Sequence, residues 1–408
     1  EVGAFAVATT VTADAASIEA AGDDVVITLG GTIGQGAYPD GAFDPFPAGV
    51  DPTDDNADAA GNLVSGAQTP DATGSWGPQI VTWNGSAGTS WTDPDNWTPR
   101  RPGGPGSVDS VIIADVADQP VLSGAATVAN LTLQSGAELF VAGNALEVTD
   151  TYAAAADGVL VLRGDESDID LRSGGAAIGA ASEGAIPGVV RYVGDGAGGG
   201  AVYDGLAERD GPAGTPIVSY THLAIDSGGL AEEFRLGGDT TVEGDLTLTS
   251  GTLIPDDSGG VGPFTLSVGG NWDSSAAGGI FDGSAGGTVV FNGTAGAQTV
   301  AADTAGGERF ASLTAANSSG APTVQLTTPI TVAGDLTIAT GTLDANDGSA
   351  HQINLGGSWT NSGGTFAPGG NSVVLDGTGS QIVSADTFAT VSIESSVTWP
   401  DQVTFSGD

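Results

Sequence analysis

The sequence contains no cysteine, methionine or lysine, and it has only two histidines among 408 residues. Without cysteine it cannot form a disulfide framework, a zinc finger, a cysteine nucleophile or a c-type haem attachment. Eight arginines oppose 50 acidic residues, so the formal net charge is −42. Polyphosphates and anionic lipids bind through lysine and arginine, so we expect neither nucleic acid nor a membrane surface as a partner.

Long apolar runs are also missing. No stretch of 18 apolar residues occurs, so we expect no membrane insertion. The first thirty residues lack the basic start and apolar middle of a secretory signal, so the sequence reads as a mature product. With 39% apolar and 14% charged residues, the chain is expected to fold. The acidic residues are mostly aspartate. That bias, without lysine, is typical of proteins kept soluble in concentrated salt or on a cell exterior, and predicts an extracellular or cell-surface location.

Internal repeats dominate the second half of the chain. The segments Thr241–Leu253 and Thr331–Leu343 read TVEGDLTLTSGTL and TVAGDLTIATGTL, 90 residues apart. Three shorter pairs follow in the same order: Gly269–Trp272 with Gly356–Trp359, Val289–Thr294 with Val373–Thr378, and Phe310–Leu313 with Phe388–Val391. A looser copy begins at Thr127. These repeats predict three modules with loops of variable length.

The composition along the chain suggests five parts. They are an N-terminal assembly segment (1–78), a tryptophan-rich cap segment (79–126), and modules 1 (127–238), 2 (239–328) and 3 (329–408). Trp83, Trp91 and Trp97 lie close together around tight turns, and we interpret them mainly as a hydrophobic lid, with a sugar-stacking platform as the alternative.

Within each module, short alternating runs are divided by glycine-containing turns, which predicts strands and turns. Only Ala13–Ala21 and Ala153–Ala156 favour a helix. Such short strands suit coils stacked along one axis, so we predict an all-β fold, a parallel β-solenoid preceded by an N-terminal strand and loop segment. At about 22 residues per coil and about 4.8 Å per coil, the repeats would form a rod about 60 Å long. We attribute the 68 glycines to bends that need positive φ.

The module pattern, T-V-x-G-D-L-T-[LI], then G-G-[NS]-W, V-V-[FL]-[ND]-G-T and F-A-x-[LV], resembles the modules of large secreted bacterial β-solenoid surface proteins of the autotransporter and filamentous-adhesin type. The likeness covers about residues 80–408. It implies a β-solenoid and a role in adhesion, matrix or filaments, without choosing among them.

The last residues, Gln402–Asp408, align with the opening of a module, as if a fourth module began there. An uncovered solenoid end exposes unpaired backbone groups that attract a further strand. We expect Val403 and Phe405 to lie at such an end, and the strand containing Phe5, Val7 and Val11 of another copy to complete it. Contacts of this head-to-tail kind grow into homopolymeric filaments.

Calcium is the one cofactor that the sequence suggests. Asp54, Asn56 and Asp58 have the alternating oxygen spacing of a calcium loop, although Ala59 and Ser65 replace the glycine and glutamate of an EF-hand. Five N-x-[ST] sequons are candidate glycosylation sites: Asn84, Asn96, Asn130, Asn292 and Asn317.

Catalytic residues are scarce. His222 and His351 are the only imidazoles, and neither accompanies a nucleophile motif. We interpret the scattered arginines as ion-pair partners of the surplus acids, and Trp272 and Trp359 as core residues. The sequence thus favours a non-enzymatic structural subunit of an extracellular filament, sheath or surface layer. The alternatives are an adhesin that binds glycans and a polysaccharide lyase or hydrolase.

Overall fold

The structure is a computed structural model. It describes Ala16–Ala21, Asp24–Leu29 and residues 78–406 except 102, 167, 181–182, 198–199, 205, 207, 210–214, 257–261, 277, 295, 304–306, 319–322 and 395–401. Phe5, Val7, Val11, Asp54, Asn56 and Asp58 lie outside the described residues, so the predicted strand donor and calcium loop stay predictions.

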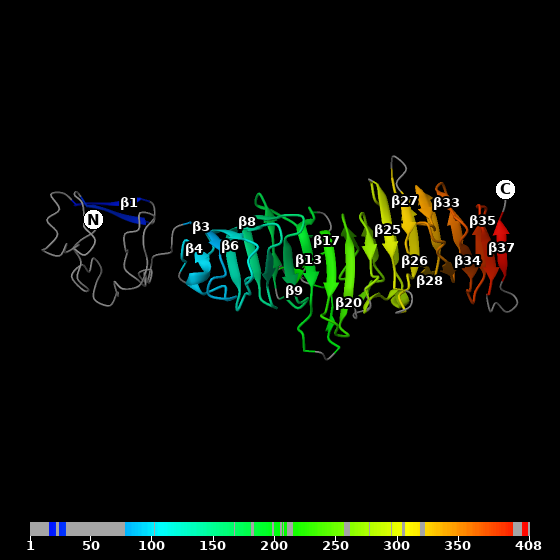
Figure 1. Cartoon of the computed structure of the whole chain (residues 1–408), viewed down its shortest axis with the longest axis horizontal. Coiled ribbons are helices and arrows are strands. Elements are labelled where there is room, and N and C mark those ends of the chain that lie inside the picture. Colours follow the sequence, from blue (N-terminus) through cyan, green and yellow to red (C-terminus); the bar gives the residue numbers. More distant parts are fainter. Residues whose placement is uncertain are drawn as a thin grey trace.

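From Ile80 onward the chain forms a parallel β-solenoid, as the repeats predicted. Figure 1 shows its strands side by side along one long axis, in chain order from β3 to β37. Each coil pairs with the coils before and after it, and nearly all these pairings are parallel. Parallel pairing follows because every coil runs around the axis in the same direction.

The strands fall into one long set of ladders, two shorter ones and three small antiparallel pairs. The long set contains β7 (Glu138–Phe140), β9 (Val159–Leu162), β13 (Ile186–Tyr192), β14 (Val202–Tyr203), β17 (Ser219–Asp226), β18 (Glu233–Arg235), β19 (Thr240–Val242), β20 (Leu246–Ile254), β21 (Thr265–Val268), β22 (Trp272–Asp273), β23 (Gly279–Phe281), β24 (Thr288–Phe291), β25 (Ala297–Ala301), β26 (Ser312–Ala316), β27 (Thr323–Leu326), β29 (Leu336–Thr340), β30 (Thr342–Asp344), β32 (Trp359–Asn361), β33 (Thr365–Ala367), β35 (Gln381–Ser384) and β37 (Val403–Ser406).

One shorter ladder begins the solenoid and contains β3 (Ile80–Trp83), β4 (Trp97–Thr98), β5 (Ser110–Ile113), β6 (Ala126–Leu133), β8 (Leu146–Ala154) and β10 (Ile169–Asp170). The other lies near its end and contains β28 (Ile330–Val332), β31 (Ile353–Leu355), β34 (Ser372–Leu375) and β36 (Thr390–Ile393). The antiparallel pairs are β1 (Ala16–Ala21) with β2 (Asp24–Leu29), β11 (Arg172–Ser173) with β12 (Ala176–Ala177), and β15 (Glu208–Arg209) with β16 (Thr215–Pro216).

Stacked positions recur at nearly constant spacing in the second half. One column of paired residues runs through Leu266, Val289, Leu313, Leu336, Trp359, Val383 and Phe405. Successive members are 22 to 24 residues apart, which agrees with the predicted coil of about 22 residues.

The core is a single apolar column inside the coils. One buried cluster extends from Val81 to Val383 without a break between modules. Alternate side chains of each strand point into it, as in β13, where every second residue is buried. A solenoid coil cannot bury its apolar face alone, so each module depends on its neighbours for stability.

The repeated sequence motifs occupy repeated positions in this column. Leu246 pairs with Trp272 in module 2, and Leu336 pairs with Trp359 in module 3. The aspartate of T-V-x-G-D then holds the next coil: Asp245 accepts a hydrogen bond from the backbone N–H before Trp272 at 2.7 Å. Asp335 does the same before Trp359, also at 2.7 Å. The motifs are therefore stacked corners of consecutive coils.

The corner glycines are needed because a side chain there would collide with the preceding coil. The sequence had instead predicted that glycine was needed for a positive φ. A Cβ on Gly269 or Gly356 would lie under 3.0 Å from the backbone of the preceding coil, yet neither residue has a positive φ. Positive φ does occur at glycines in other turns, including Gly136 and Gly370. Coils about 4.8 Å apart leave no room for a side chain where two corners stack directly.

The two helix predictions are wrong. Ala16–Ala21 is strand β1, and Ala153 and Ala154 belong to β8, where they pair with β6. Alanine favours helices locally, but the pairing of neighbouring strands overrides that preference. The described residues contain two short 3₁₀ turns, Pro94–Asn96 (η1) and Gly283–Ala285 (η2). Within the described part of the chain, no helix has the length and apolar character needed to cross a membrane.

Candidate interaction surface

The first coils of the solenoid are closed by a cap. Trp97 packs edge to face against Trp83 and Trp91, with ring centroids 5.0 and 4.9 Å apart, and all three indoles are buried. Strand β4 runs antiparallel to β3 over this cluster. Arg101 and Asp109 form a buried bidentate ion pair beside it, with both N···O distances at 2.9 Å. The three tryptophans are therefore buried core residues of the first described coils and do not present a sugar-stacking surface.

Strands β36 and β37 are the last strands that the structure describes. The outer edges of β36 and β37 have no paired strand among the residues that the structure describes. Ile393 and Phe405 face inward, opposite Leu375 and Val383, but 55% and 54% of their surfaces are exposed. In Figure 1, β37 lies nearest the C-terminus.

Module 2 shows what the same positions look like when covered. By strand register, Ala315 and Leu326 occupy the places of Ile393 and Phe405, and both are fully buried. They are covered because β29 and β30 pair with β26 and β27. Ile393 and Phe405 therefore occupy inward-facing positions of the last strands that the structure describes.

The register of the last strand differs from the sequence alignment. In β37, Val403 pairs with Gln381 and Phe405 with Val383, as Val324 pairs with Gln298 in β27. Residues 403–406 therefore take the place of the closing strand of module 2 and not of a module opening. Both strands alternate apolar and polar residues, so the short alignment did not distinguish them.

Among the predicted assembly residues, the structure brings Val403 and Phe405 together on one side of β37. Of the predicted glycosylation sites, Asn84, Asn130 and Asn292 are partly exposed. Asn96 and Asn317 are buried, and Asn96 uses its side chain to bind the backbones of Ala87 and Ser90. The prediction is corrected at these two positions, because the folded chain does not present them to solvent.

The two histidines have structural contacts. His222 Nδ1 accepts a hydrogen bond from the backbone N–H of Asp245 at 3.0 Å, at a module corner. His351 Nε2 lies 2.8 Å from Asp347, and this contact lowers the pKa of that carboxyl group. Among the described residues, no three Asp, Glu, His or Cys side chains are grouped in a way that could hold a metal ion.

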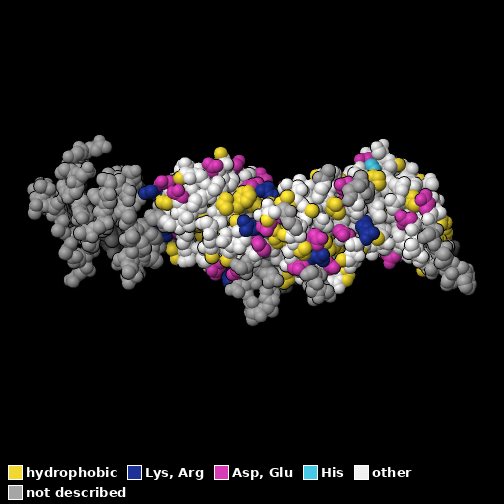
Figure 2. Space-filling view, turned by 90° about the horizontal axis from the view of Figure 1, so that it is seen from below, with side chains coloured by type: hydrophobic (Ala, Val, Ile, Leu, Met, Phe, Trp, Pro, Cys, Tyr) yellow, Lys and Arg dark blue, Asp and Glu magenta, His cyan; other side chains and the backbone are white. Residues whose placement is uncertain are grey.

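Most arginines whose side chains are described pair with acidic residues, as predicted. The pairs are Arg100–Asp95, Arg101–Asp109, Arg172–Asp170, Arg191–Glu138 and Arg235 with Asp256 and Glu233. In Figure 2 the acidic side chains are scattered over the visible face with basic ones among them. Apart from the buried Arg101–Asp109, these partly exposed pairs contribute little stability each, but they moderate the repulsion between acidic groups.

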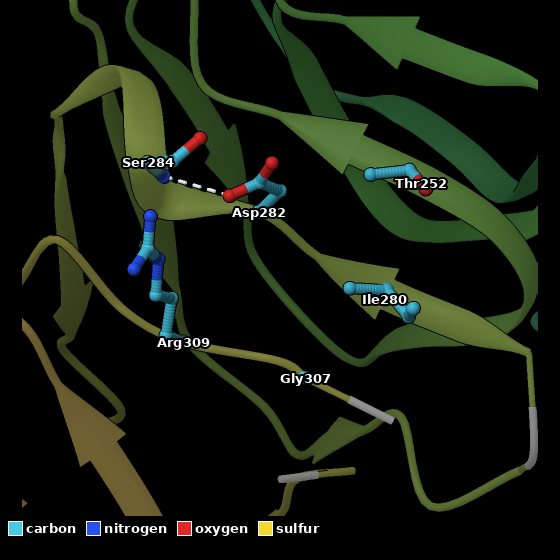
Figure 3. Close-up of a pocket in the computed structure, with 6 residues that line it drawn as sticks. All are labelled: Thr252, Ile280, Asp282, Ser284, Gly307 and Arg309. Atoms are coloured by element: carbon cyan, nitrogen blue, oxygen red, sulfur yellow. Dashed lines mark hydrogen bonds between the residues drawn. The ribbon is translucent and has the colours of Figure 1, made fainter. Parts of the chain in front are cut away.

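A shallow hollow lies on the side of module 2. Its volume is about 360 Å³, and its lining includes Thr252, Ile280, Asp282, Ser284 and Arg309. In Figure 3 the guanidinium of Arg309 points toward the turn that carries Ser284, whose backbone N–H donates to Asp282 at 2.8 Å. Arg309 is exposed, so the hollow combines hydroxyl groups, one carboxylate and one cation.

The sequence did not reveal that each recurring tryptophan is hydrogen-bonded to a carboxylate. The Trp272 indole N–H donates to Glu308 at 3.1 Å, and the Trp359 indole N–H donates to Asp386 at the same distance. Burial raises the pKa of Glu308 to about 7, although hydrogen bonds from Ser274, the Asp303 backbone and Trp272 oppose the rise. The available signal was an acidic residue two places before the recurring phenylalanine of each module.

Both tryptophans also pack in the same way. Trp272 meets Phe281 and Phe310 with ring centroids 5.2 Å apart, while Trp359 meets Phe366 and Phe388 at 4.7 and 5.0 Å. Both indoles are fully buried. They are core residues, as predicted, and do not present a surface to a sugar.

Comparison with known proteins gives one match. A family model described as "Domain of unknown function (DUF8693)" matches residues 82–179, which include the tryptophan cap and the first coils of the solenoid. No curated protein and no solved structure matches the chain.

Proposed function

We propose that the protein is a structural subunit of an extracellular filament, sheath or surface layer, in which rods are joined end to end along the solenoid axis. The observation that supports this proposal is the continuous stack of parallel strands around one apolar core, which makes the chain a rod. Rods of stacked parallel coils are suited to structural roles, because each coil is bound to the coils before and after it.

The mechanical properties follow from the ladders. Their backbone hydrogen bonds run along the rod, and one continuous core links the modules. A load along the axis would therefore be shared by many parallel hydrogen bonds. The charge of −42 opposes side-by-side clumping of rods until calcium or another cation screens the acidic surface.

Negative-stain electron microscopy of protein taken from its native cells tests the proposal. We expect fibres of a single rod's width, with an axial repeat equal to the length of one subunit. Deleting residues 1–12 should reduce fibre formation if the predicted strand of Phe5, Val7 and Val11 takes part. Dispersed single rods from cells and from concentrated purified protein would contradict an end-to-end assembly.

The hollow beside Arg309 favours a glycan-binding adhesin as a second candidate function. Its volume is within the range of small-ligand sites, and an exposed guanidinium beside hydroxyl groups suits an acidic sugar. A glycan array would then show saturable retention by monomeric protein that Arg309→Gln abolishes. Arg100→Gln, at the far cap, is the matched control and should leave retention unchanged.

A further inference from the structure

Glu232 places a carboxylate on the inward side of the solenoid wall. It comes directly before β18, two residues from the buried Phe234, and is itself 0% exposed. Neither oxygen of its carboxylate accepts a hydrogen bond from a described residue. No described arginine or histidine forms an ion pair with it. A buried carboxylate with neither a donor nor a cation is costly, so its charge requires a partner.

Glu166 shows how the same part of the chain satisfies a buried carboxylate. It is 4% exposed and accepts hydrogen bonds from the backbone N–H groups of Gly143, Arg163 and Gly164 at 3.2, 2.6 and 2.8 Å. Several donors aimed at one carboxylate stabilise its charge without another ion. Glu232 is at least as buried but has no such set of donors.

The turn after β13 brings a second carboxylate to Glu232. Gly194 lies directly against it, because a Cβ on Gly194 would overlap Oε2 of Glu232. The carboxyl group of the exposed Asp195 lies within hydrogen-bonding reach of Glu232, and its Oδ1 accepts a hydrogen bond from the Ala197 N–H at 2.8 Å. Burial and the Asp195 carboxylate raise the pKa of Glu232, and the backbone N–H of Gly196 opposes this rise without reaching hydrogen-bond geometry. Two like charges therefore meet with no described cation between them.

Tyr203 fixes this turn beside Glu232. Parallel pairing of β14 with β18 places Tyr203 opposite Phe234, and the two rings stack with centroids 5.1 Å apart. The Tyr203 hydroxyl accepts a hydrogen bond from the backbone N–H of Asp195 at 2.6 Å. Burial raises the pKa of Tyr203 to about 12, and the charges of Glu232, Asp195 and Asp165 add to the rise. The phenol therefore holds the turn where negative charge is concentrated.

We propose that Asp195 and Glu232 bind one calcium ion. Calcium takes carboxylate oxygens in monodentate or bidentate fashion, and backbone carbonyls and water complete its shell. Both oxygens of Glu232 are available for bidentate binding, which suits calcium better than the smaller, strictly octahedral magnesium. The exposed Asp195 gives the ion access from solvent.

This site has two carboxylates, so it agrees with the finding that no three acidic or histidine side chains are grouped among the described residues. It is separate from the predicted loop of Asp54, Asn56 and Asp58. It also does not depend on the proposed filament, because the ion would be held within one chain.

Glu232→Gln is the informative variant, because it keeps the side-chain size and removes the charge. Without calcium this variant should fold at least as well as the wild type, since it removes a buried charge that lacks a donor. Glu233→Gln is the matched control. It removes the same charge one residue later, from a partly exposed side chain that pairs with Arg235 at 3.0 Å.

Hydrogen exchange of the full chain with and without calcium measures binding at the turn itself. A background of about 0.5 M sodium chloride screens the general attraction of calcium to the acidic surface. With calcium at about ten times its dissociation constant, exchange of the Asp195 and Ala197 amides should slow about tenfold in the wild type and in Glu233→Gln. Glu232→Gln should show no slowing.

Asp195→Asn provides a second test at an exposed side chain, where the core is unchanged, and it should also lose the slowing. Equal slowing in the wild type and in both site variants would mean that calcium acts on the acidic surface in general, and the inference would be wrong. An absence of slowing in the wild type would overturn it as well. In that case, exchange at the turn that becomes faster as pH rises would show that the two carboxyl groups share a proton instead.

Discussion

Replacing Gly377 with alanine tests the reasoning about stacked corners. A Cβ at this residue would overlap the carbonyl oxygen of Gly356 in the preceding coil and stand 3.0 Å from Gln381. Gly377 has no positive φ, so the effect would be purely steric. Two residues later, Gly379 also lacks a positive φ, and a Cβ there would have no atom within 4 Å. Gly379→Ala is thus a matched control in the same turn.

The expected magnitude follows from the atoms that must move. Backbone atoms of one coil cannot shift without disturbing the ladders on either side, so Gly377→Ala should cost about 2–3 kcal/mol, at the upper end of ordinary overpacking. Gly379→Ala should be neutral or stabilise the fold by up to about 1 kcal/mol, because alanine restricts the unfolded chain.

Hydrogen exchange is the suitable assay, since a repeat array need not unfold in one step. The amide of Asp376 donates to Leu355 at 3.1 Å, next to the predicted overlap. Its exchange should be about 30- to 150-fold faster in Gly377→Ala, the equivalent of 2–3 kcal/mol, and no faster in Gly379→Ala. Similar exchange in the two variants would refute the argument that the repeated glycines are needed for space.

Three further predictions concern the core, pH and the cap. Trp359→Ala should cost about 3–5 kcal/mol by hydrogen exchange of the coils beside it, whereas outward-facing Thr360→Ala should change stability by under about 0.5 kcal/mol; equal effects would contradict a core role. The raised pKa of Glu308 means that the folded state keeps a proton that the unfolded state loses. Stability should therefore fall by up to about 3 kcal/mol as pH rises from about 4.5 through 7, and a pH series on Glu308→Gln should lack this fall. Arg101→Ala should cost about 3–5 kcal/mol by hydrogen exchange of the first coils, because it leaves the buried carboxylate of Asp109 without its cation, while Arg100→Ala, at a partly exposed ion pair, should cost under about 1 kcal/mol.

The sequence predicted the fold class because strand alternation and repeat spacing can be seen in residues close together in the chain. Alternating apolar residues specify which side chains face a core, and repeated motifs at similar spacing specify stacked coils. The aspartate of T-V-x-G-D and the glycines of G-G-[NS]-W were visible as a pattern. Their roles as a hydrogen-bond acceptor and as space between coils became clear only when Asp335 and Gly356 were seen against their neighbouring coils.

The errors have a common cause. The alanines around Ala153 favour a helix in isolation, but pairing with β6 places them in a strand. Glu308 and Trp272 are 36 residues apart, so their hydrogen bond depends on how one coil lies over the next. Asn96 carries a sequon, yet its burial is decided by the cap that folds around it.

The sequence by itself determined that this chain forms a repeating β-structure with an inward apolar face and an acidic exterior, because alternation and charge are properties of neighbouring residues. Only the tertiary structure decided which strand covers which. It placed β37 as the counterpart of β27. The physical reason is that many strands share the same alternation, so their order along the axis depends on pairing between coils.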